Sequence, residues 1–162
     1  VLLAWRMRLS MWKLLDVAAI FATVGQFFGR IGNIINGDVI GYPTSLPWGI
    51  VYANPYSFPP RHDIAYQPAA IYEALLDVFL FGLLWWLRNR VRPGMLIFVY
   101  IFGYSLGQLL IFVWRDNVVI FAGLKQAQLT AIAVVIVAAI LFIWFRSRLP
   151  HPTEASDKSG SP

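Results

Sequence analysis

The sequence predicts an all-α integral membrane protein, because its apolar residues are gathered in long runs that few charges interrupt. Of its 162 residues, 59% are hydrophobic and 13% are charged, and the mean hydropathy is +0.64. This apolar share is well above that of a soluble domain. Three runs, at 69–87, 94–114 and 127–145, each approach the roughly 20 residues that cross a bilayer core. With a fourth and more polar run at 14–36, we expect a bundle of about four complete transmembrane helices.

The two ends of the chain differ from these runs. The chain begins with VLLAW, which is too short to span a membrane and resembles the end of a further helix. We therefore expect the end of a fifth span there, and treat the sequence as a fragment of a longer protein. The last residues, HPTEASDKSGSP, are polar and predicted to be disordered. The expected organisation is a partial transmembrane domain over 1–149 and a disordered tail over 150–162.

The basic residues predict the orientation of the spans. Nine of the thirteen lie on alternate connections, which the positive-inside rule assigns to the cytoplasm. The C-terminal tail is then cytoplasmic, and the long connection at 37–67 is extracytoplasmic. This connection is rich in Pro, Gly, Tyr and Asn, and its WGIVYANP stretch is a candidate for short strands. The nine residues are Arg6, Arg8, Lys13, Arg88, Arg90, Arg92, Arg146, Arg148 and Lys158.

The composition also excludes several classes of site. The chain has no cysteine, so neither a disulfide framework nor a thiolate metal site is available. Its only histidines are His62 and His151, so we expect no metal site and no cofactor. The net charge of +5 is spread over the connections and not clustered on one soluble surface. Nucleic-acid binding requires such clustering, and the bilayer is the expected partner.

The segment GRIGNIINGDVIG, at 29–41, places costly polar groups at the outer end of the first run. Arg30 is followed one helical turn later by Asn33, and then by Asn36 and Asp38. Ionisable groups within a membrane are functional-site candidates, and a guanidinium with nearby amide donors suits a phosphate. The alternatives are a structural polar knot, or an arginine that only reaches the lipid headgroups.

A second polar cluster, YQPAAIYEALLD at 66–77, stands at the start of the next run. Pro68 is predicted to open a helix, which places Glu73 and Asp77 on one helical face, four residues apart. Glu73 is close enough to the interface for snorkelling or capping, whereas Asp77 lies deeper and is expected to meet an arginine or water. We favour an arginine–carboxylate network that holds Arg30 in place.

Two glycine pairs predict close helix packing. GQFFG contains Gly25 and Gly29, and GYSLG contains Gly103 and Gly107. Small residues four apart let transmembrane helices approach each other closely. We therefore expect the first and third spans to lie inside the bundle.

Taken together, these segments resemble the prolipoprotein diacylglyceryl transferase family. GRIGNIINGDVIG is similar to the family signature, QPAAIYE to a downstream segment, and DVAAIFATVGQFFGR to the helix that leads into the signature. FVWRDN, followed by AQLTAIAVVI, resembles the last outer loop and final helix. The resemblance covers about residues 1–146. It implies a seven-helix enzyme of the bacterial inner membrane with its C-terminus inside, of which this chain supplies the end of the third span and the later spans.

The resemblance also implies a reaction, the first step of bacterial lipoprotein modification. A diacylglyceryl group passes from phosphatidylglycerol to the lipobox cysteine thiol of a prolipoprotein, and glycerol phosphate leaves. Arg30 is the expected catalytic residue, because a positioned cation stabilises the charge that develops on the phosphate. The family's thiol-activating histidine segment would precede residue 1, so residues 1–162 alone are expected to be inactive. The expected lipid-binding residues are Arg30, Asn33 and Gly41, and the supporting polar network comprises Asn36, Asp38, Tyr72, Glu73, Asp77, Gln108 and Arg115.

One departure from the family leaves the function open. The family carries a second essential arginine seven residues before the arginine that matches Arg115, and Gln108 occupies that position here. Phe112 stands where an acid is expected. Either Arg115 or another cation substitutes, or this homologue is impaired and only binds anionic lipid. A transporter or channel subunit is the remaining alternative, supported only by the acids of one span.

Overall fold

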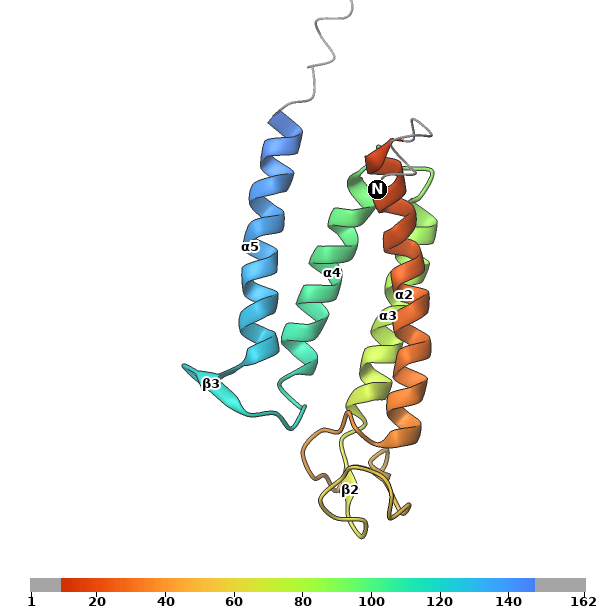
Figure 1. The fold of residues 1–162 in the computed structure, drawn as a ribbon, viewed down its shortest axis with the longest axis vertical. Helices are drawn as coiled ribbons and strands as arrows, with labels where there is room; N and C mark the ends of the chain where they lie inside the picture. The colour runs from red at the N-terminus through yellow and green to blue at the C-terminus, as the bar shows by residue number, and fades with distance from the viewer. Residues whose placement is uncertain (1–9, 148–162) are drawn as a thin grey trace, which may run out of the picture.

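The computed structural model describes residues 10–147, and side chains over 10–144, as a bundle of four helices with its longer loops at one end (Figure 1). Helices α2, α3 and α4 pack against one another, and α5 packs against α4. The connection at 88–94 lies at the end of the bundle opposite the longer loops. The four helices are α2 (Met11–Asn36), α3 (Ala69–Leu87), α4 (Met95–Ile111) and α5 (Gln126–Ser147).

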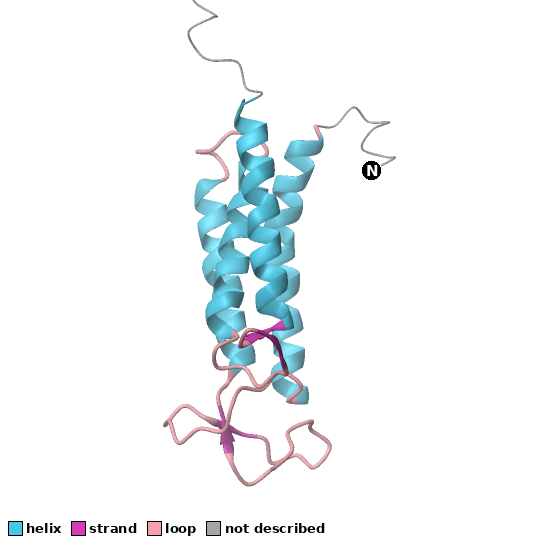
Figure 2. Ribbon diagram, turned by 90° about the vertical axis from the view of Figure 1, so that its left-hand side faces the viewer, coloured by secondary structure: helices cyan, strands magenta, loops and turns pink. Residues whose placement is uncertain are grey.

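Two small antiparallel hairpins shape the loop end (Figure 2). Strand β1 (Ile50–Val51) pairs with β2 (Ala65–Tyr66) in the connection between α2 and α3. Strand β3 (Val119–Phe121) pairs with β4 (Leu124–Lys125) between α4 and α5. The strand predicted within WGIVYANP is confirmed by β1.

The described helices agree with most of the predicted spans. Helices α2, α3 and α5 are long and apolar enough to cross a membrane, by length and composition. The predicted run 94–114 forms a helix only as far as Ile111, so α4 has 17 residues. The chain is therefore an all-α membrane protein, while the number of four complete spans stays a prediction. The expected fifth helix end and the tail at 150–162 lie outside the described residues.

A side chain of α2 fixes where α4 begins. Asp16 accepts a hydrogen bond from the Gly94 backbone N–H at 2.5 Å and another from the Ile97 N–H at 3.1 Å. A carboxylate at this position satisfies two of the free N–H groups of a helix N-terminus and interacts favourably with its dipole. Gly94 has a φ of 91°, and a Cβ there would meet the Trp12 ring. Asp16 thus ties α2 to α4 at the end of the bundle opposite the long loops.

The two glycine pairs behave differently. A Cβ at Gly103 would lie 2.6 Å from the Leu80 side chain, and one at Gly107 would overlap Leu76. The predicted close approach is therefore confirmed for α4, which packs on α3 through these glycines. At Gly25 and Gly29 on α2, no described residue lies within 4 Å of a Cβ, so the predicted packing through this pair is not seen among the described residues.

The bundle leads to a topology prediction. The long connection, which contains Ser57, and the 88–94 connection, which contains Asn89, lie at opposite ends of the helices. Single cysteines placed at these two positions should be labelled from opposite sides of the membrane, with Ser57→Cys reacting with an impermeant thiol reagent added outside intact cells. The chain has no cysteine of its own to interfere. Labelling of Asn89→Cys but not Ser57→Cys from outside would contradict the orientation.

Candidate functional site

Three distant chain segments meet through backbone hydrogen bonds at the loop end of the bundle. The Gly41 N–H donates to the Gln67 carbonyl at 2.9 Å, and the Tyr42 N–H donates to the Trp114 carbonyl at 2.9 Å. The Asp116 N–H donates in turn to the Ile40 carbonyl at 3.2 Å. The end of the polar segment after α2 is thus held between the residues before α3 and those after α4. We call this arrangement, of residues 40–43, 65–67 and 114–116, the backbone junction.

Gly41 stands where the junction is tightest. A Cβ at this position would lie 2.5 Å from the Trp114 carbonyl oxygen and 2.9 Å from that of Gln67. Both atoms belong to the backbone, so they cannot move aside as a flexible side chain could. This close approach is sufficient to require glycine, whereas the expected role of Gly41 in lipid binding stays a prediction.

The junction brings two arginines to one buried carboxylate. Glu73, in the second turn of α3, has a side chain only 1% exposed. Its Oε2 lies 2.7 Å from Nη1 of Arg30 on α2, and its Oε1 accepts a hydrogen bond from Nη1 of Arg115 at 3.0 Å. We call these three residues the Arg–Glu–Arg cluster. The expected arginine–carboxylate network is present, but Glu73 is buried within it and does not snorkel or cap.

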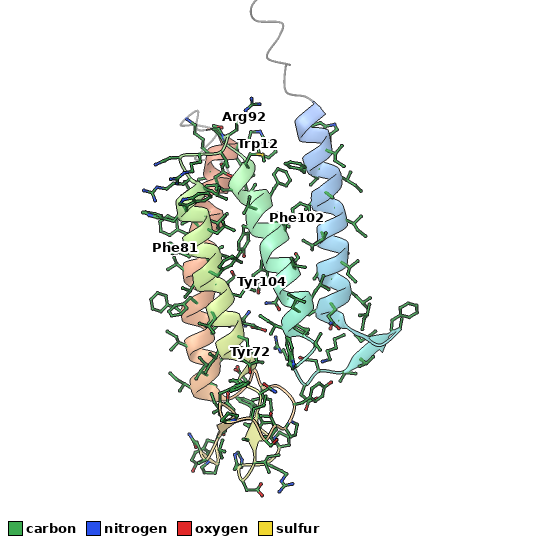
Figure 3. The ribbon with its side chains drawn as sticks, turned by 180° about the vertical axis from the view of Figure 1, so that it is seen from behind. Trp12, Tyr72, Phe81, Arg92, Phe102 and Tyr104 are labelled. Carbon is green, nitrogen blue, oxygen red and sulfur yellow. The ribbon has the colours of Figure 1, made fainter. Side chains whose placement is uncertain are left out.

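A tyrosine of α4 completes the surroundings of Arg30. The Arg30 Nη2 donates to the Tyr104 hydroxyl at 3.2 Å, and Figure 3 shows Tyr104 at mid-height in the bundle. The Nε of Arg30 is buried and makes no hydrogen bond with a described residue. Sequence reasoning missed Tyr104, although this residue is one of two polar residues within GYSLG and stands next to Gly103, which packs on α3. The Arg30 guanidinium is therefore held by Glu73 and Tyr104, and its Nε–H has no acceptor among the described residues.

Asp77 lies outside the Arg–Glu–Arg cluster. Its side chain is buried, with a residue exposure of 1%, but neither carboxylate oxygen accepts a hydrogen bond from the described residues. No described arginine forms a salt bridge with Asp77, because Glu73, one turn nearer the loops, pairs with both guanidinium groups. The expected contact of Asp77 with an arginine is therefore not seen among the described residues, and its expected contact with water stays a prediction. Asp77 is thus a second buried carboxylate close to the cluster in sequence but not bonded to it.

The Tyr72 side chain belongs to a different network, nearer the loops (Figure 3). Its hydroxyl donates to Gln67 Oε1 at 2.7 Å and accepts from the Trp48 Nε1–H at 2.9 Å. The Gln67 amide also donates to the Thr44 hydroxyl at 3.3 Å. These bonds fix the connection between α2 and α3 over the start of α3, so Tyr72 supports the site through the loop and not through Arg30.

The remaining polar residues of the signature segment do not contact the cluster through any described hydrogen bond. Asn36 and Asp38 are exposed, and the Asn36 carbonyl accepts from the Phe58 N–H at 3.3 Å. The carbonyl of Asn33, which is half-buried, accepts from the Gly37 N–H at 2.8 Å where α2 ends in a left-handed turn. Burial, and then the Asp38 carboxylate, raise the pKa of the Tyr52 hydroxyl, which therefore stays protonated. The roles of Asn33, Asn36 and Asp38 toward a ligand stay predictions.

The imidazole of His62 is engaged in the same connection. Its Nδ1 lies 2.8 Å from the Tyr52 carbonyl, and because a carbonyl only accepts hydrogen bonds, this nitrogen carries the proton. Across the part of the chain that the structure describes, no group of three or more His, Asp or Glu side chains is arranged to hold a metal ion.

The close packing at Gly41 leads to a stability prediction. In the whole protein, Gly41→Ala should lower the melting temperature, with a cost of about 1–3 kcal/mol for overpacking a tight site. The matched control is Gly82→Ala on α3, where no described residue lies within 4 Å of a Cβ and alanine is the better helix former. Equal melting temperatures for the two variants would show that the junction tolerates a side chain.

Comparison with known proteins gives a consistent set of relatives. The family model described as prolipoprotein diacylglyceryl transferase matches residues 1–144. A phosphatidylglycerol–prolipoprotein diacylglyceryl transferase of Thermosynechococcus vestitus is 38% identical over 146 residues, which are 88% of this chain and 53% of that protein. A protein of the same name in Synechocystis sp. is 32% identical over 147 residues, which are 85% of this chain and 51% of that protein. Another, in Nitratidesulfovibrio vulgaris, is 45% identical over 82 residues, which are 50% of this chain and 29% of that protein.

The match covers only part of the length of these relatives. The chain spans about half the length of the curated relatives it matches. No solved structure matches it. Because the family model covers most of the sequence, the chain belongs to the prolipoprotein diacylglyceryl transferase family.

Proposed function

We propose that this chain forms the arginine-bearing half of an enzyme that transfers a diacylglyceryl group from phosphatidylglycerol to the lipobox cysteine of a prolipoprotein. The observation that carries this proposal is the Arg–Glu–Arg cluster, in which Arg30 is oriented by the buried Glu73 and by Tyr104. The names of the relatives, each a phosphatidylglycerol–prolipoprotein diacylglyceryl transferase, support the choice of substrates.

The proposed reaction places its charge where Arg30 can stabilise it. The cysteine sulfur attacks the glyceryl carbon and forms a C–S bond, while the bond from that carbon to the phosphate oxygen breaks. The electron pair of the broken bond leaves with glycerol phosphate, and the thiol proton passes to a base. Arg30 has a free Nε–H and a guanidinium fixed by its two partners. A positioned cation of this kind stabilises the developing phosphate charge without reorganising.

Glu73 and Arg115 have positioning roles in this proposal. Glu73 holds Arg30 through one carboxylate oxygen and Arg115 through the other. The Arg115 guanidinium also lies over the Phe112 ring, 4.7 Å from its centroid, a favourable cation–π arrangement. Arg115 thereby links the cluster to the end of α4 while Arg30 remains the residue directed toward the ligand.

The proposed location is the bacterial inner membrane, with the site on the extracytoplasmic side and the C-terminus in the cytoplasm. The 88–94 connection lies at the end of the bundle opposite the longer loops, and its residues include Arg88, Arg90 and Arg92. Such a basic connection is typical of the cytoplasmic side under the positive-inside rule. The lipobox cysteine of an exported prolipoprotein and the phosphate of an outer-leaflet lipid would then meet at the same membrane surface.

An impaired homologue is the alternative function, favoured by one observation. Gln108 supplies no charge where the family resemblance expects its second arginine. Phosphatidylglycerol-dependent lipidation of a lipobox peptide by the whole protein would separate the two. We expect a thioether-linked product from the cysteine peptide and none from a cysteine-to-serine peptide. Binding of phosphatidylglycerol without product would favour the impaired homologue, and neither binding nor product would favour a transporter or channel subunit.

The role of Arg30 leads to a prediction for the whole protein. Arg30→Lys keeps the charge but loses the planar fork that donates two parallel hydrogen bonds, so transferase activity should fall by about 10²–10³-fold. Arg61→Lys is the matched control, because Arg61 forms an exposed ion pair with Asp63 outside the cluster, and its activity should stay at the wild-type level.

A companion substitution tests the purely structural alternative. If Arg30 serves only to neutralise Glu73, then Arg30→Ala combined with Glu73→Gln should recover both the melting temperature and the activity. We expect the double variant to remain inactive, because the phosphate still lacks its cation. Recovery of activity in the double variant, or wild-type activity in Arg30→Lys, would argue against direct phosphate binding.

A further inference from the structure

The tip of the β3–β4 hairpin is apolar and exposed. Four consecutive residues, Val118 to Phe121, are between 51% and 83% exposed, and no charged residue stands between Asp116 and Lys125 in the sequence. Apolar side chains scattered singly over a surface are ordinary, whereas a contiguous exposed run marks a contact with a partner or with a membrane. The hairpin is therefore a surface that requires an apolar neighbour.

The hairpin lies at the depth of the helices and not beyond them. Figure 1 shows β3 pointing sideways from the start of α5, at the height of the last turns of α2 and the first turns of α3. The 37–67 connection, in contrast, extends past the ends of these helices. Because α2, α3 and α5 are long and apolar enough to cross a membrane, a bilayer around the bundle would reach this height. The hairpin therefore projects toward lipid.

The length of α4 supports the same depth. The helix has 17 residues and is about 26 Å long at the helical rise, whereas the hydrocarbon core of a bilayer is about 30 Å thick. A span of this length that begins at one membrane surface ends inside the opposite leaflet, so the residues that follow it remain at membrane depth. Trp114, which follows α4 and is exposed, suits the headgroup level at which tryptophan is enriched.

Buried side chains from β4 and α5 satisfy the backbone where α4 ends. The Lys125 ammonium donates to the Phe112 carbonyl at 2.5 Å and to the Arg115 carbonyl. The Gln128 amide donates to the Leu109 carbonyl at 3.2 Å and accepts from the Lys125 N–H at 3.0 Å. Non-helical backbone at membrane depth is tolerated where protein groups satisfy it in this way. These bonds therefore suit a segment that lies within the outer part of a leaflet.

The turn of the hairpin also favours apolar surroundings. Phe121 pairs with Leu124, so Ala122 and Gly123 form a two-residue turn, in which their φ angles are 48° and 78°. Turns that need a positive φ at both positions usually place Asn or Asp before the glycine, because these short polar side chains tolerate that conformation. With alanine instead, the tip lacks the polar residue that a turn of this kind usually carries.

We propose that the β3–β4 hairpin inserts into the interfacial region of the bilayer, on the side of the longer loops, with its apolar side chains among the acyl chains. The outer edge of β3 has no partner strand in the described part of the chain. Insertion is therefore shallow, at a level where headgroups and water can bond the free backbone groups of that edge. The inference goes beyond the proposed function and holds for any reaction at the Arg–Glu–Arg cluster.

The surroundings of the hairpin favour lipid as its neighbour. The exposed apolar side chains of Leu110, Val113 and Trp114 continue its surface along the end of α4. A second copy of the chain, or another part of the whole protein, could cover an apolar hairpin at any height. The depth of the hairpin and the satisfied backbone beside it are required only where lipid surrounds the segment.

Quenching by spin-labelled lipid tests this contact in the whole protein. In a version without other cysteines, Phe121→Cys is labelled with a fluorophore, and the protein is reconstituted in phosphatidylcholine vesicles. These vesicles carry a nitroxide either near the headgroup or near the end of the acyl chain. We expect the shallow nitroxide to quench the label several-fold more strongly than the deep one, because the hairpin lies at the interface.

The matched control for this label is Asp63→Cys, on the 37–67 connection. The exposed fractions are close, 68% for the Asp63 side chain and 69% for Phe121, and loss of the exposed ion pair with Arg61 costs little. The control label should be quenched by iodide in the water and only weakly by either lipid.

A charge on the hairpin tests whether its apolar side chains hold it in the bilayer. In the labelled Phe121→Cys protein, Val118→Asp should lower lipid quenching toward the level of the control, because a charge is costly in the apolar part of a bilayer. Val118→Leu should leave the quenching unchanged. Val118 is 83% exposed, so neither substitution should alter the melting temperature of the solubilised protein appreciably.

The remaining outcomes would overturn the proposal. Stronger quenching of the Phe121→Cys label by iodide than by lipid would place the hairpin in water, and protection from both quenchers would place it against another copy or another part of the protein. Stronger quenching by the deep nitroxide would contradict the interfacial depth. Equal lipid quenching in Val118→Asp and Val118→Leu would show that the apolar tip does not drive insertion. None of these measurements requires transferase activity.

Discussion

The buried carboxylate of Glu73 is the group on which the rest of the site depends. It lies on α3, and its two oxygens face Arg30 on α2 and Arg115 after α4, so a single side chain ties three parts of the bundle together. A buried carboxylate is tolerated only when it is paired, and removal of one partner from a buried pair costs about 3–5 kcal/mol. With two guanidinium groups the charge of Glu73 is fully compensated. The cluster then keeps a surplus of positive charge on its arginines, and the proposed binding of a phosphate depends on this surplus.

The backbone junction decides whether this arrangement can form. The backbone of Arg115 pairs with that of Gly41 in an antiparallel bridge, next to the hydrogen bond from the Tyr42 N–H to the Trp114 carbonyl. This pairing places the Arg115 side chain within reach of Glu73. Gly41 permits that approach, and Lys125 closes the other side of the same turn by donating to the carbonyls of Phe112 and Arg115. The glycines of the signature segment thus have distinct uses. Gly37 ends α2 with a φ of 68°, and Gly41 makes room for a neighbouring backbone.

The departures of this chain from its family find physical counterparts in the structure. Phe112, which stands where an acid is expected, lies beneath the Arg115 guanidinium and contributes an aromatic face to it. Gln108 is buried, and its Nε2 finds no hydrogen-bond acceptor among the described residues.

The sequence by itself determined the membrane class, the helix positions and the two polar segments. Apolar runs and proline or glycine boundaries are local properties, and they predicted α3 over 69–87 and an arginine–carboxylate network around Arg30. Only the tertiary structure decided which carboxylate pairs with the arginines. Glu73 and Asp77 share a helical face, and one turn of difference, about 5.4 Å, separates the acid that meets both guanidinium groups from the one that meets neither. Tyr104 contacts Arg30 for the same reason, because contacts between residues more than seventy positions apart depend on how helices pack and not on any local pattern.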